Sequence, residues 1–382
     1  MTDASKPRAV IVGAGIGGLA AAIALERAGY RVTVLERAPE LRELGFALLL
    51  AGNAMRALRM LGVAERVLAQ AEVARDGDLR AMDGRVLKRV SMAGIQDAIG
   101  EAAVCSLREV LHGALLAQLT AAEIRTRARA VGFEQSASGV EVQLEDGERV
   151  AGDLLVAADG LHSVVRAALH GDALRASGLT AYRGVARAAH WHATGTQFFG
   201  RGIEAGVGRA GAGAVYWYLS HKEPAARTAL EPKAAALDCT RGCDPELVAL
   251  IERTDPDHVR RDELFDRAPL QAWGRGRATL LGDAAHPMLP HAGQGAAQAL
   301  EDAVVLGRCL ASGTDPVAGL RRYERLRIAR TTKVVSIARR NARISSVDNP
   351  WVCALRDQLL AHGPAAMMEK QLVSLARVEL EV

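Results

Sequence analysis

The sequence predicts an α/β domain joined to a second, mostly antiparallel β region, and three observations lead to this fold class. A short apolar run at residues 8–12 ends in a glycine-rich turn, which a helix-like segment and a second strand follow. Two later apolar strands, near residues 153–159 and 277–281, also end at a carboxylate beside a glycine. Between them, residues 180–264 change to alternating strands separated by glycine turns. A chain of 382 residues is long enough for two domains.

The first strand leads into the motif Gly-Ala-Gly-Ile-Gly-Gly at residues 13–18, which opens the helix. Gly13 permits a tight turn, Gly15 lets the backbone approach a pyrophosphate, and Gly18 lets helix and strand pack closely. The N–H groups at the helix N-terminus favour a phosphate. The second strand ends in Glu36, whose carboxylate can accept hydrogen bonds from ribose hydroxyls. This order of elements predicts a dinucleotide site rather than a purely structural glycine turn.

Composition argues against several classes of function. The net charge is only +4, and the basic residues are scattered along the chain, which argues against a nucleic-acid-binding surface. Five cysteines without regular spacing predict reduced thiols, as in a cytosol, and no metal site. Four glycines interrupt the apolar run at residues 10–25, and no cleavage-type sequence follows it. We therefore expect a soluble, cytoplasmic protein.

Local patterns predict further elements between these strands. Asn53 is a plausible N-cap of a helix, and the alternation over residues 78–90 is typical of a hairpin. Ser106 and Glu109 fit a capping box. That box places Arg108 in the first turn of a helix, where it can meet an anion or remain a solvated surface residue.

The two later strand ends carry a second pair of carboxylates. Asp159 precedes a glycine, and carboxylates at strand ends of an open parallel sheet face the ligand crevice, although Asp-Gly is also a common turn pair. Asp283 leads into a proline-stiffened loop that contains His291, and Gly295 then opens a helix whose N–H groups would stabilise an anionic ring system. The helix over residues 316–343 is rich in arginine; a solvated basic face is the default interpretation, and a membrane-surface helix is the alternative.

Residues 180–264 hold three of the five tyrosines and two of the four tryptophans. An aromatic-bearing sheet can form the wall of an apolar substrate pocket. Ordinary sheet core explains each ring equally well.

The three motifs together resemble the FAD-dependent aromatic-ring monooxygenases of the para-hydroxybenzoate hydroxylase type, and more closely the branch of salicylate hydroxylase and FAD-dependent urate hydroxylase. The resemblance covers nearly the whole chain. It implies a Rossmann-like FAD-binding domain of the glutathione-reductase type, with an inserted, mostly antiparallel β-sheet substrate domain and C-terminal helices. The implied division assigns residues 1–75, 101–175 and 269–345 to FAD binding, residues 76–100 and 176–268 to the substrate domain, and residues 346–382 to a C-terminal helical segment.

The resemblance also implies a role for residues in each motif. The expected FAD contacts are Gly13, Gly15, Ile16, Gly17 and Gly18 at the pyrophosphate, Glu36 at the ribose, Arg37 and Val131 at the adenine, Arg108 at the phosphate and ribityl region, Asp159, Asp283 at the ribityl O3′, and Gly293, Gln294, Gly295 and Ala296 along the pyrimidine edge. Asp159 is further linked to nicotinamide handling. Arg183 would lie near the flavin ring, and His291 would contact the substrate or act as a base.

The implied activity is that of a group A flavoprotein monooxygenase. NAD(P)H reduces a tightly but non-covalently bound FAD, O2 forms a flavin C4a-hydroperoxide, and an aromatic or heteroaromatic small molecule is hydroxylated. A second glycine-rich nucleotide fold is absent from the sequence, which agrees with transient NAD(P)H binding and leaves the choice between NADH and NADPH open. We expect no nucleic-acid partner and no membrane span, and either a monomer or a homodimer.

Other activities of the same fold remain open. One is a flavoprotein oxidoreductase or epoxidase acting on a non-phenolic substrate, and another is a redox sensor without hydroxylase activity. A flavin-dependent halogenase would carry a Trp-x-Trp-x-Ile-Pro segment, which is missing. A simple NAD dehydrogenase would leave the motifs at Asp159 and Asp283 without a role.

Overall fold

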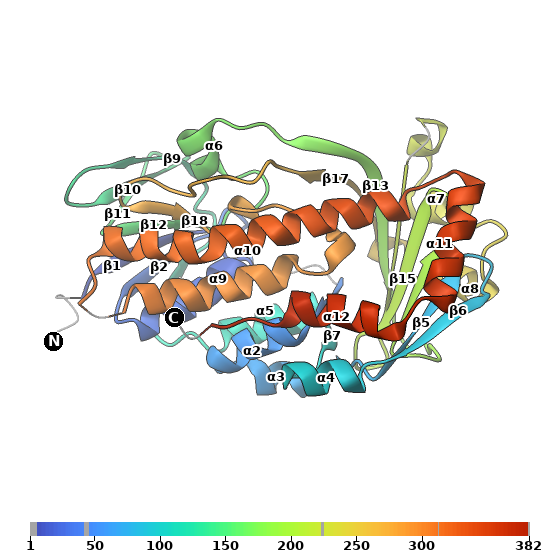
Figure 1. Cartoon of the computed structure of the whole chain (residues 1–382). Helices are drawn as coiled ribbons and strands as arrows, with labels where there is room; N and C mark the ends of the chain where they lie inside the picture. The colour runs from blue at the N-terminus through green and yellow to red at the C-terminus, as the bar shows by residue number, and fades with distance from the viewer. Residues whose placement is uncertain (1–5, 42–45, 223–224, 312, 381–382) are drawn as a thin grey trace.

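The structure, a computed structural model, describes residues 6–41, 46–222, 225–311 and 313–380. Figure 1 shows two β-sheet regions at opposite ends of the molecule, with the long helix α10 (Pro316–Ser345) running from one to the other beside helix α9 (Gly295–Cys309). An α/β region is thus combined with a mostly antiparallel sheet, which confirms the expected fold class.

The first region is built on a parallel five-stranded sheet in the order β18-β12-β1-β2-β8. Its strands are β1 (Arg8–Val12), β2 (Arg31–Leu35), β8 (Glu123–Arg125), β12 (Leu154–Ala157) and β18 (Ala278–Leu280). All but the first residue of β1 are buried, as expected for a central parallel strand covered on both faces. Because parallel strands end at the same edge, the glycine turn after β1 and the acidic residues that follow β2, β12 and β18 come to one edge of the sheet.

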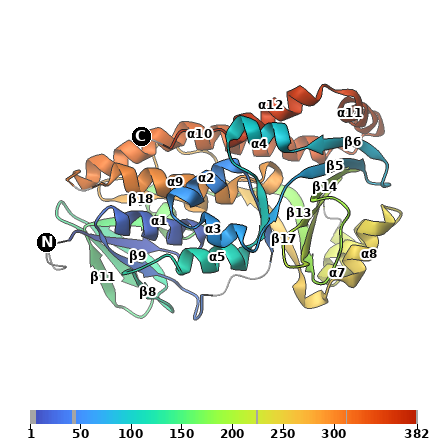
Figure 2. The same cartoon turned by 90° about the horizontal axis from the view of Figure 1, so that it is seen from below.

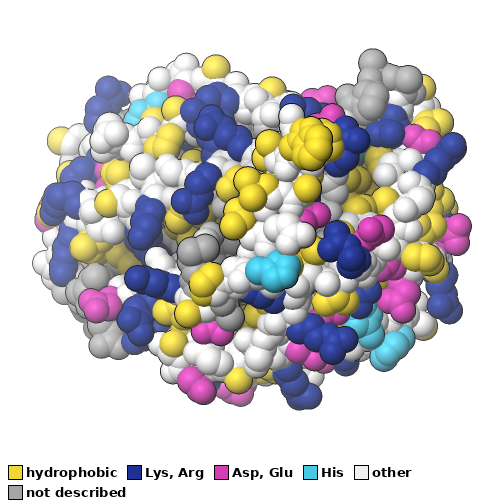
Figure 3. Space-filling view, turned by 45° about the vertical axis from the view of Figure 1, so that its right-hand side comes forward, with side chains coloured by type: hydrophobic (Ala, Val, Ile, Leu, Met, Phe, Trp, Pro, Cys, Tyr) yellow, Lys and Arg dark blue, Asp and Glu magenta, His cyan; other side chains and the backbone are white. Residues whose placement is uncertain are grey.

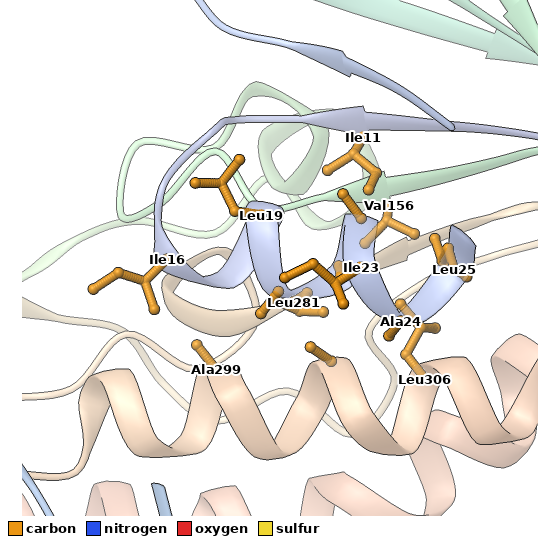
Figure 4. Packing of buried hydrophobic residues seen from close by; sticks show 14 of the residues in the cluster. Ile11, Ile16, Leu19, Ile23, Ala24, Leu25, Val156, Leu281, Ala299 and Leu306 are labelled. Atoms are coloured by element: carbon orange, nitrogen blue, oxygen red, sulfur yellow. The ribbon is translucent and has the colours of Figure 1, made fainter. Parts of the chain in front are cut away.

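Helix α1 (Ile16–Arg27) connects β1 to β2 and packs against α9, as Figure 4 shows. The two helices approach closely because their contact is made of small residues: a Cβ on Gly307 would lie 2.8 Å from the Cβ of Ala24. Larger side chains such as Ile23 and Leu306 are buried around this contact. Each contributes roughly 1.5–3 kcal/mol to folding relative to leaving it exposed.

The second region is a seven-stranded sheet in the order β17-β13-β16-β15-β14-β5-β6. Its strands are β5 (Asp76–Ala81), β6 (Val86–Ser91), β13 (Arg175–Ala186), β14 (Gly195–Phe199), β15 (Ile203–Arg209), β16 (Val215–His221) and β17 (Val259–Asp266). β14 and β5 pair in parallel, and the other neighbours are antiparallel. The hairpin expected over residues 78–90 is present as β5 and β6. Helices α7 (Pro232–Cys239) and α8 (Pro245–Arg253), which the sequence pattern did not predict, cover one face of this sheet (Figure 2).

Two small sheets and several helices complete the fold. The sheets have the orders β11-β10-β9 and β3-β7-β4. The remaining elements are β3 (Ala47–Leu50), β4 (Glu72–Val73), β7 (Val104–Leu107), β9 (Ala130–Gln135), β10 (Val140–Leu144), β11 (Arg149–Gly152), α2 (Gly52–Met60), α3 (Ala64–Leu68), α4 (Ala93–Ile99), α5 (Arg108–Leu116), α6 (Val164–His170), α11 (Pro350–His362) and α12 (Ala365–Ala376). Among the described residues, no helix combines the length and the apolar character needed to cross a membrane.

Two predicted helix caps are wrong. Helix α2 begins one residue before Asn53, whose buried side chain instead donates to Gln294 (2.8 Å) and Glu301 (2.6 Å). Ser106 lies in strand β7, and α5 begins at Arg108 without a side-chain cap. The local pattern assigned both residues to caps. Asn53 instead makes a buried tertiary contact, and Ser106 lies in the part of β7 that pairs with β3.

A buried charge network joins α9, α10 and the loop after β18. Arg327 of α10 donates to Glu301 and Asp302 of α9, each at 2.6 Å, and all three side chains are at most 2% exposed. Asp302 also accepts the backbone N–H of Gly282 (3.1 Å) and lies 2.6 Å from Nε2 of His286. Burial opposes its charged form, but the charges of His286 and Arg327 prevail and lower the pKa of Asp302 below its ordinary value.

Replacing Arg327 with Met is expected to lower the free energy of unfolding by up to about 3–5 kcal/mol, because two buried carboxylates would lose the cation they share, leaving Glu301 with Arg330 and Asp302 with His286. Urea denaturation of the purified protein measures this change. Arg125→Met is the matched control, since its ion pair with Glu148 lies at the surface and should contribute little. Similar midpoints for both variants would contradict this account of the network.

Candidate active site

The glycine turn after β1 depends on two of its glycines for steric reasons. Gly13 has a φ of +102°, and a Cβ there would lie 2.4 Å from the carbonyl oxygen of Ala158. A Cβ on Gly18 would lie 1.9 Å from the carbonyl oxygen of Gly13. Gly15 differs, because its φ of −71° suits any residue and nothing lies within 4 Å of a Cβ placed on it. The fold therefore does not require a glycine at position 15.

Glu36, at the end of β2, is held against this turn. Its Oε2 accepts the backbone N–H of Ala14 and its Oε1 accepts that of Ala38, each at 2.8 Å. The carbonyl of Glu36 accepts the N–H of Ala128 from the connection between β8 and β9 (2.8 Å). Each carboxylate oxygen thus keeps a lone pair with which it can accept a ligand hydroxyl.

Asp159, two residues beyond β12, carries an unsatisfied buried acceptor. Its Oδ2 accepts the N–H of Val164 at 2.9 Å, whereas its Oδ1 is buried without a hydrogen-bond partner. Burial raises the pKa of this carboxyl above its ordinary value, in spite of hydrogen bonds from Ser163 and from backbone N–H groups. A buried oxygen of this kind calls for a donor from a ligand or water.

Asp283 lies in the short turn after β18. Hydrogen bonds with buried side chains hold the backbone of this turn in place. Arg166 donates to the carbonyls of Ala284 (2.9 Å) and Ala285 (2.7 Å), and Asp302 accepts the N–H of Gly282. The Asp283 side chain remains open to solvent, but the protein crowded around it removes enough water to raise its pKa. The positive charges of His286 and Arg108 partly offset this rise. Arg108 is therefore close enough to Asp283 for its charge to act on this carboxyl.

The loop from Pro290 to Ala292 leads into α9. Gly293 has a φ of +60°, which favours glycine, and Gln294 is buried and accepts a hydrogen bond from Asn53 (2.8 Å). Gly295 is the first residue of α9, Ala296 is half-buried, and no side chain caps this end of the helix. The first N–H groups of α9 are thus available to an acceptor.

Close contacts bring the three motifs together. A Cβ on Gly13 would lie 3.1 Å from Cα of Asp159, and one on Gly17 would lie 2.8 Å from Leu281. Next to Gly17, Ile16 begins α1 with its side chain buried. The glycine turn therefore touches both the segment after β12 and the segment before Asp283.

Two expected FAD contacts lie at the margin of this arrangement. Arg37 follows Glu36 with its side chain exposed. Val131 is 51% exposed and lies within strand β9.

One face of the antiparallel sheet carries a polar row that sequence analysis did not find. The register places Arg183 beside Tyr218, Tyr218 beside Gly206, and Gly206 beside Gln197, so that all four point to the same face. The opposite face holds the apolar core under α7 and α8. Alternation of Glu204, Gly206 and Gly208 with buried apolar neighbours along β15 is the sequence signal that could have revealed this division.

His291 meets this sheet face. Its Nε2 lies 3.2 Å from Oγ of Ser220, and its Nδ1 is buried without a partner. Glu204, next to Ser220 in the register, is buried and accepts hydrogen bonds from Tyr218 (2.9 Å) and Gln197 (3.0 Å).

Burial favours the neutral form of His291. Burial lowers the pKa of His291 below its ordinary value, the charge of Glu204 opposes the change, and the charge of Arg183 adds to it. Arg183 itself lies 3.6 Å from Asp262. Arg183, expected near the flavin ring, and His291, expected at the substrate, thus lie on the same side of the sheet.

Comparison with known proteins shows the family to which the chain belongs. A family model described as an FAD binding domain matches residues 6–338. The 3-hydroxybenzoate 6-hydroxylase 1 of Aquipseudomonas alcaligenes is 36% identical over 370 residues, covering 92% of each chain. The aurachin C monooxygenase/isomerase of Stigmatella aurantiaca is 35% identical over 361 residues, covering 92% of this chain and 93% of the relative.

Solved structures give the same result. Klebsiella pneumoniae HpxO, crystallised with FAD and uric acid, superposes with a TM-score of 0.88 at 28% identity, over 97% of this chain and 96% of that chain. A single-residue variant of HpxO, crystallised with FAD, reaches a TM-score of 0.90 at 29% identity, over 97% of this chain and 98% of that chain. The chain therefore belongs to the family of FAD-binding flavoprotein monooxygenases.

Proposed function

We propose that this protein uses FAD, NAD(P)H and O2 to hydroxylate an aromatic or heteroaromatic small molecule. The observation that carries the proposal is the meeting of the three strand-end segments with the polar face of the antiparallel sheet, through the contact of His291 with Ser220. The residues expected at the dinucleotide then lie next to a partly aromatic sheet face.

The residues of the three strand-end segments fit FAD. The open approach to Gly15 and the N-terminus of α1 suit a pyrophosphate, and the two anchored oxygens of Glu36 suit ribose hydroxyls. The unpartnered Oδ1 of Asp159 and the accessible carboxyl of Asp283 are acceptors for further hydroxyl or N–H groups. We assign the uncapped N–H groups at the start of α9 to the pyrimidine edge of the flavin, where they would stabilise negative charge.

When bound, FAD supplies hydride acceptance from NAD(P)H and activation of O2. The protein's own part is to position the aromatic ring, to exclude water and to move a proton. Neutral His291 has an available ring nitrogen, Nδ1, which can take a proton from a ring hydroxyl and so make the ring more electron-rich. Tyr216 and Tyr218 of β16 contribute aromatic surface to the sheet face that would exclude water.

The cellular setting follows from the thiols. The described residues include all five cysteines, and none of them forms a disulfide. We infer a reducing compartment, and propose a cytoplasmic location.

The proposed reaction is tested by supplying the purified, FAD-loaded protein with NADH or NADPH and a panel of phenolic and heteroaromatic compounds under 18O2. The expected result is that some compounds accelerate NAD(P)H oxidation and that a hydroxylated product carries one 18O atom. Flavin reduction that no aromatic compound accelerates would instead favour a redox sensor. An 18O-labelled epoxide would favour the epoxidase alternative.

Two glycine variants separate folding from cofactor binding. Gly15→Ala should leave the thermal midpoint of the FAD-free protein unchanged but weaken FAD binding at least tenfold, because the methyl group projects where the pyrophosphate would approach. Gly18→Ala should lower the midpoint of the FAD-free protein, because its Cβ would collide with the backbone of Gly13. Unchanged FAD affinity in Gly15→Ala would argue against the assigned pyrophosphate position.

His291→Gln should retain FAD while lowering the fraction of NAD(P)H consumption that yields hydroxylated product, since the ring base is lost. Because the pKa of His291 is lowered, the acid limb of kcat/KM in the wild type should lie below pH 6.5, the ordinary value for histidine. The variant should lose that limb. Stopped-assay product quantification across pH measures both effects, and a variant with normal coupling and an unchanged limb would remove His291 from the site.

A further inference from the structure

Helix α11 turns its charges inward and its apolar residues outward. Its two charged side chains, Arg356 and Asp357, pair with each other at 2.9 Å and are 9% and 17% exposed. Arg356 also donates to the carbonyl of Gly200 and lies over the ring of Phe199, which binds the helix to the end of β14. The usual pattern of a surface helix, with charges facing solvent, is reversed here.

The outward side of α11 is a continuous apolar stripe. Trp351 is 84% exposed, and Leu355 and Leu359 follow it at intervals of four residues with 59% and 63% exposure. Val352 of α11 is 47% exposed, and so is Ile344, which lies at the end of α10 shortly before α11 begins. We call these five residues the α11 apolar face. Large apolar side chains grouped in this way mark an interaction surface.

The surroundings of the α11 apolar face are basic. Arg340 and Arg343, in the last two turns of α10, are exposed, and among the described residues no acidic side chain pairs with either. Figure 3, which brings this end of the molecule forward, shows exposed hydrophobic side chains with Lys and Arg beside them.

These charges discriminate between two possible occupants of the face. A second copy of the chain would bring like-charged rims together, because the acids of residues 340–363 are already engaged: Asp348 with Arg201, and Asp357 with Arg356. An anionic lipid surface suits both the apolar side chains and the neighbouring arginines. Tryptophan and leucine enter the boundary between headgroups and acyl chains, and arginines meet lipid phosphates.

We propose that the α11 apolar face docks on the surface of an anionic membrane, without spanning it. The chain would be a peripheral membrane protein whose antiparallel sheet, through α11 and β6, lies next to the bilayer. This inference is independent of the flavin and of the hydroxylation reaction.

The protein contains its own probe for the test. Of the four tryptophans, Trp191, Trp217 and Trp273 are at most 3% exposed, so Trp351 is the solvent-exposed emitter. Holoprotein is mixed with vesicles of phosphatidylcholine alone, or of phosphatidylcholine with phosphatidylglycerol, and binding is followed by flotation and tryptophan emission. We expect flotation and a blue shift with the anionic vesicles, both weakened by salt.

Variants then locate the contact. Leu355→Glu with Leu359→Glu should abolish flotation, and Arg340→Gln with Arg343→Gln should weaken it by roughly 25-fold, about fivefold for each charge removed from an anionic surface. The control is Leu326→Glu, which also replaces an exposed leucine with an acid. Leu326 is 40% exposed and lies in α10 far from the end that leads to α11, so this variant should float like the wild type.

All these positions are exposed, and unchanged thermal midpoints would verify that the variants fold. Absence of flotation with anionic vesicles would overturn the proposal. So would a dimer in solution that Leu355→Glu with Leu359→Glu converts to a monomer while vesicle binding is absent, because the face would then be an interface between copies.

Discussion

The buried ion pairs of Arg327 with Glu301 and Asp302 are the constraint on which the remaining structure depends. Charges of this kind are costly to remove from water, and they persist only where several partners hold them. Here the partners come from α9, α10 and the loop after β18, and Asn53 adds α2 through Glu301. The network thus fixes the N-terminal half of α9 relative to the turn at Asp283, the two pieces that would lie along the flavin.

The two sheets contribute to the site in different ways. Strands β1, β2, β12 and β18 end at one edge of a parallel sheet. The rigid sheet therefore holds the residues just beyond these strands close to one another. The antiparallel sheet contributes a face rather than an edge. Its alternation sends Trp217 and Phe198 into the core under α7 and α8, and sends Arg183 and Tyr218 toward His291.

Whether a residue's role can be predicted from the sequence depends on how far along the chain its partners lie. Gly18 is predictable because its constraint is local, between the turn and the helix that follows it, and Gly13 is predictable because the turn requires its φ of +102°. Arg166 and Arg327 are not, since a buried arginine looks in the sequence like the many exposed ones, and only its distant partners distinguish it. Asn53 was mistaken for a cap for the same reason, because its partners lie more than 240 residues away. Glu204 could have been found from the alternation along β15, but which face of that strand meets the loop at His291 is a matter of tertiary packing.

The central claim is that three segments, distant in the chain, form a single flavin site. Calorimetric titration of the FAD-free protein with FAD tests it most directly. The account predicts one FAD bound per chain, together with a thermal midpoint that rises with FAD concentration, because a ligand that binds the folded state stabilises it. A protein that takes up no FAD, or whose midpoint does not respond to saturating FAD, would contradict it.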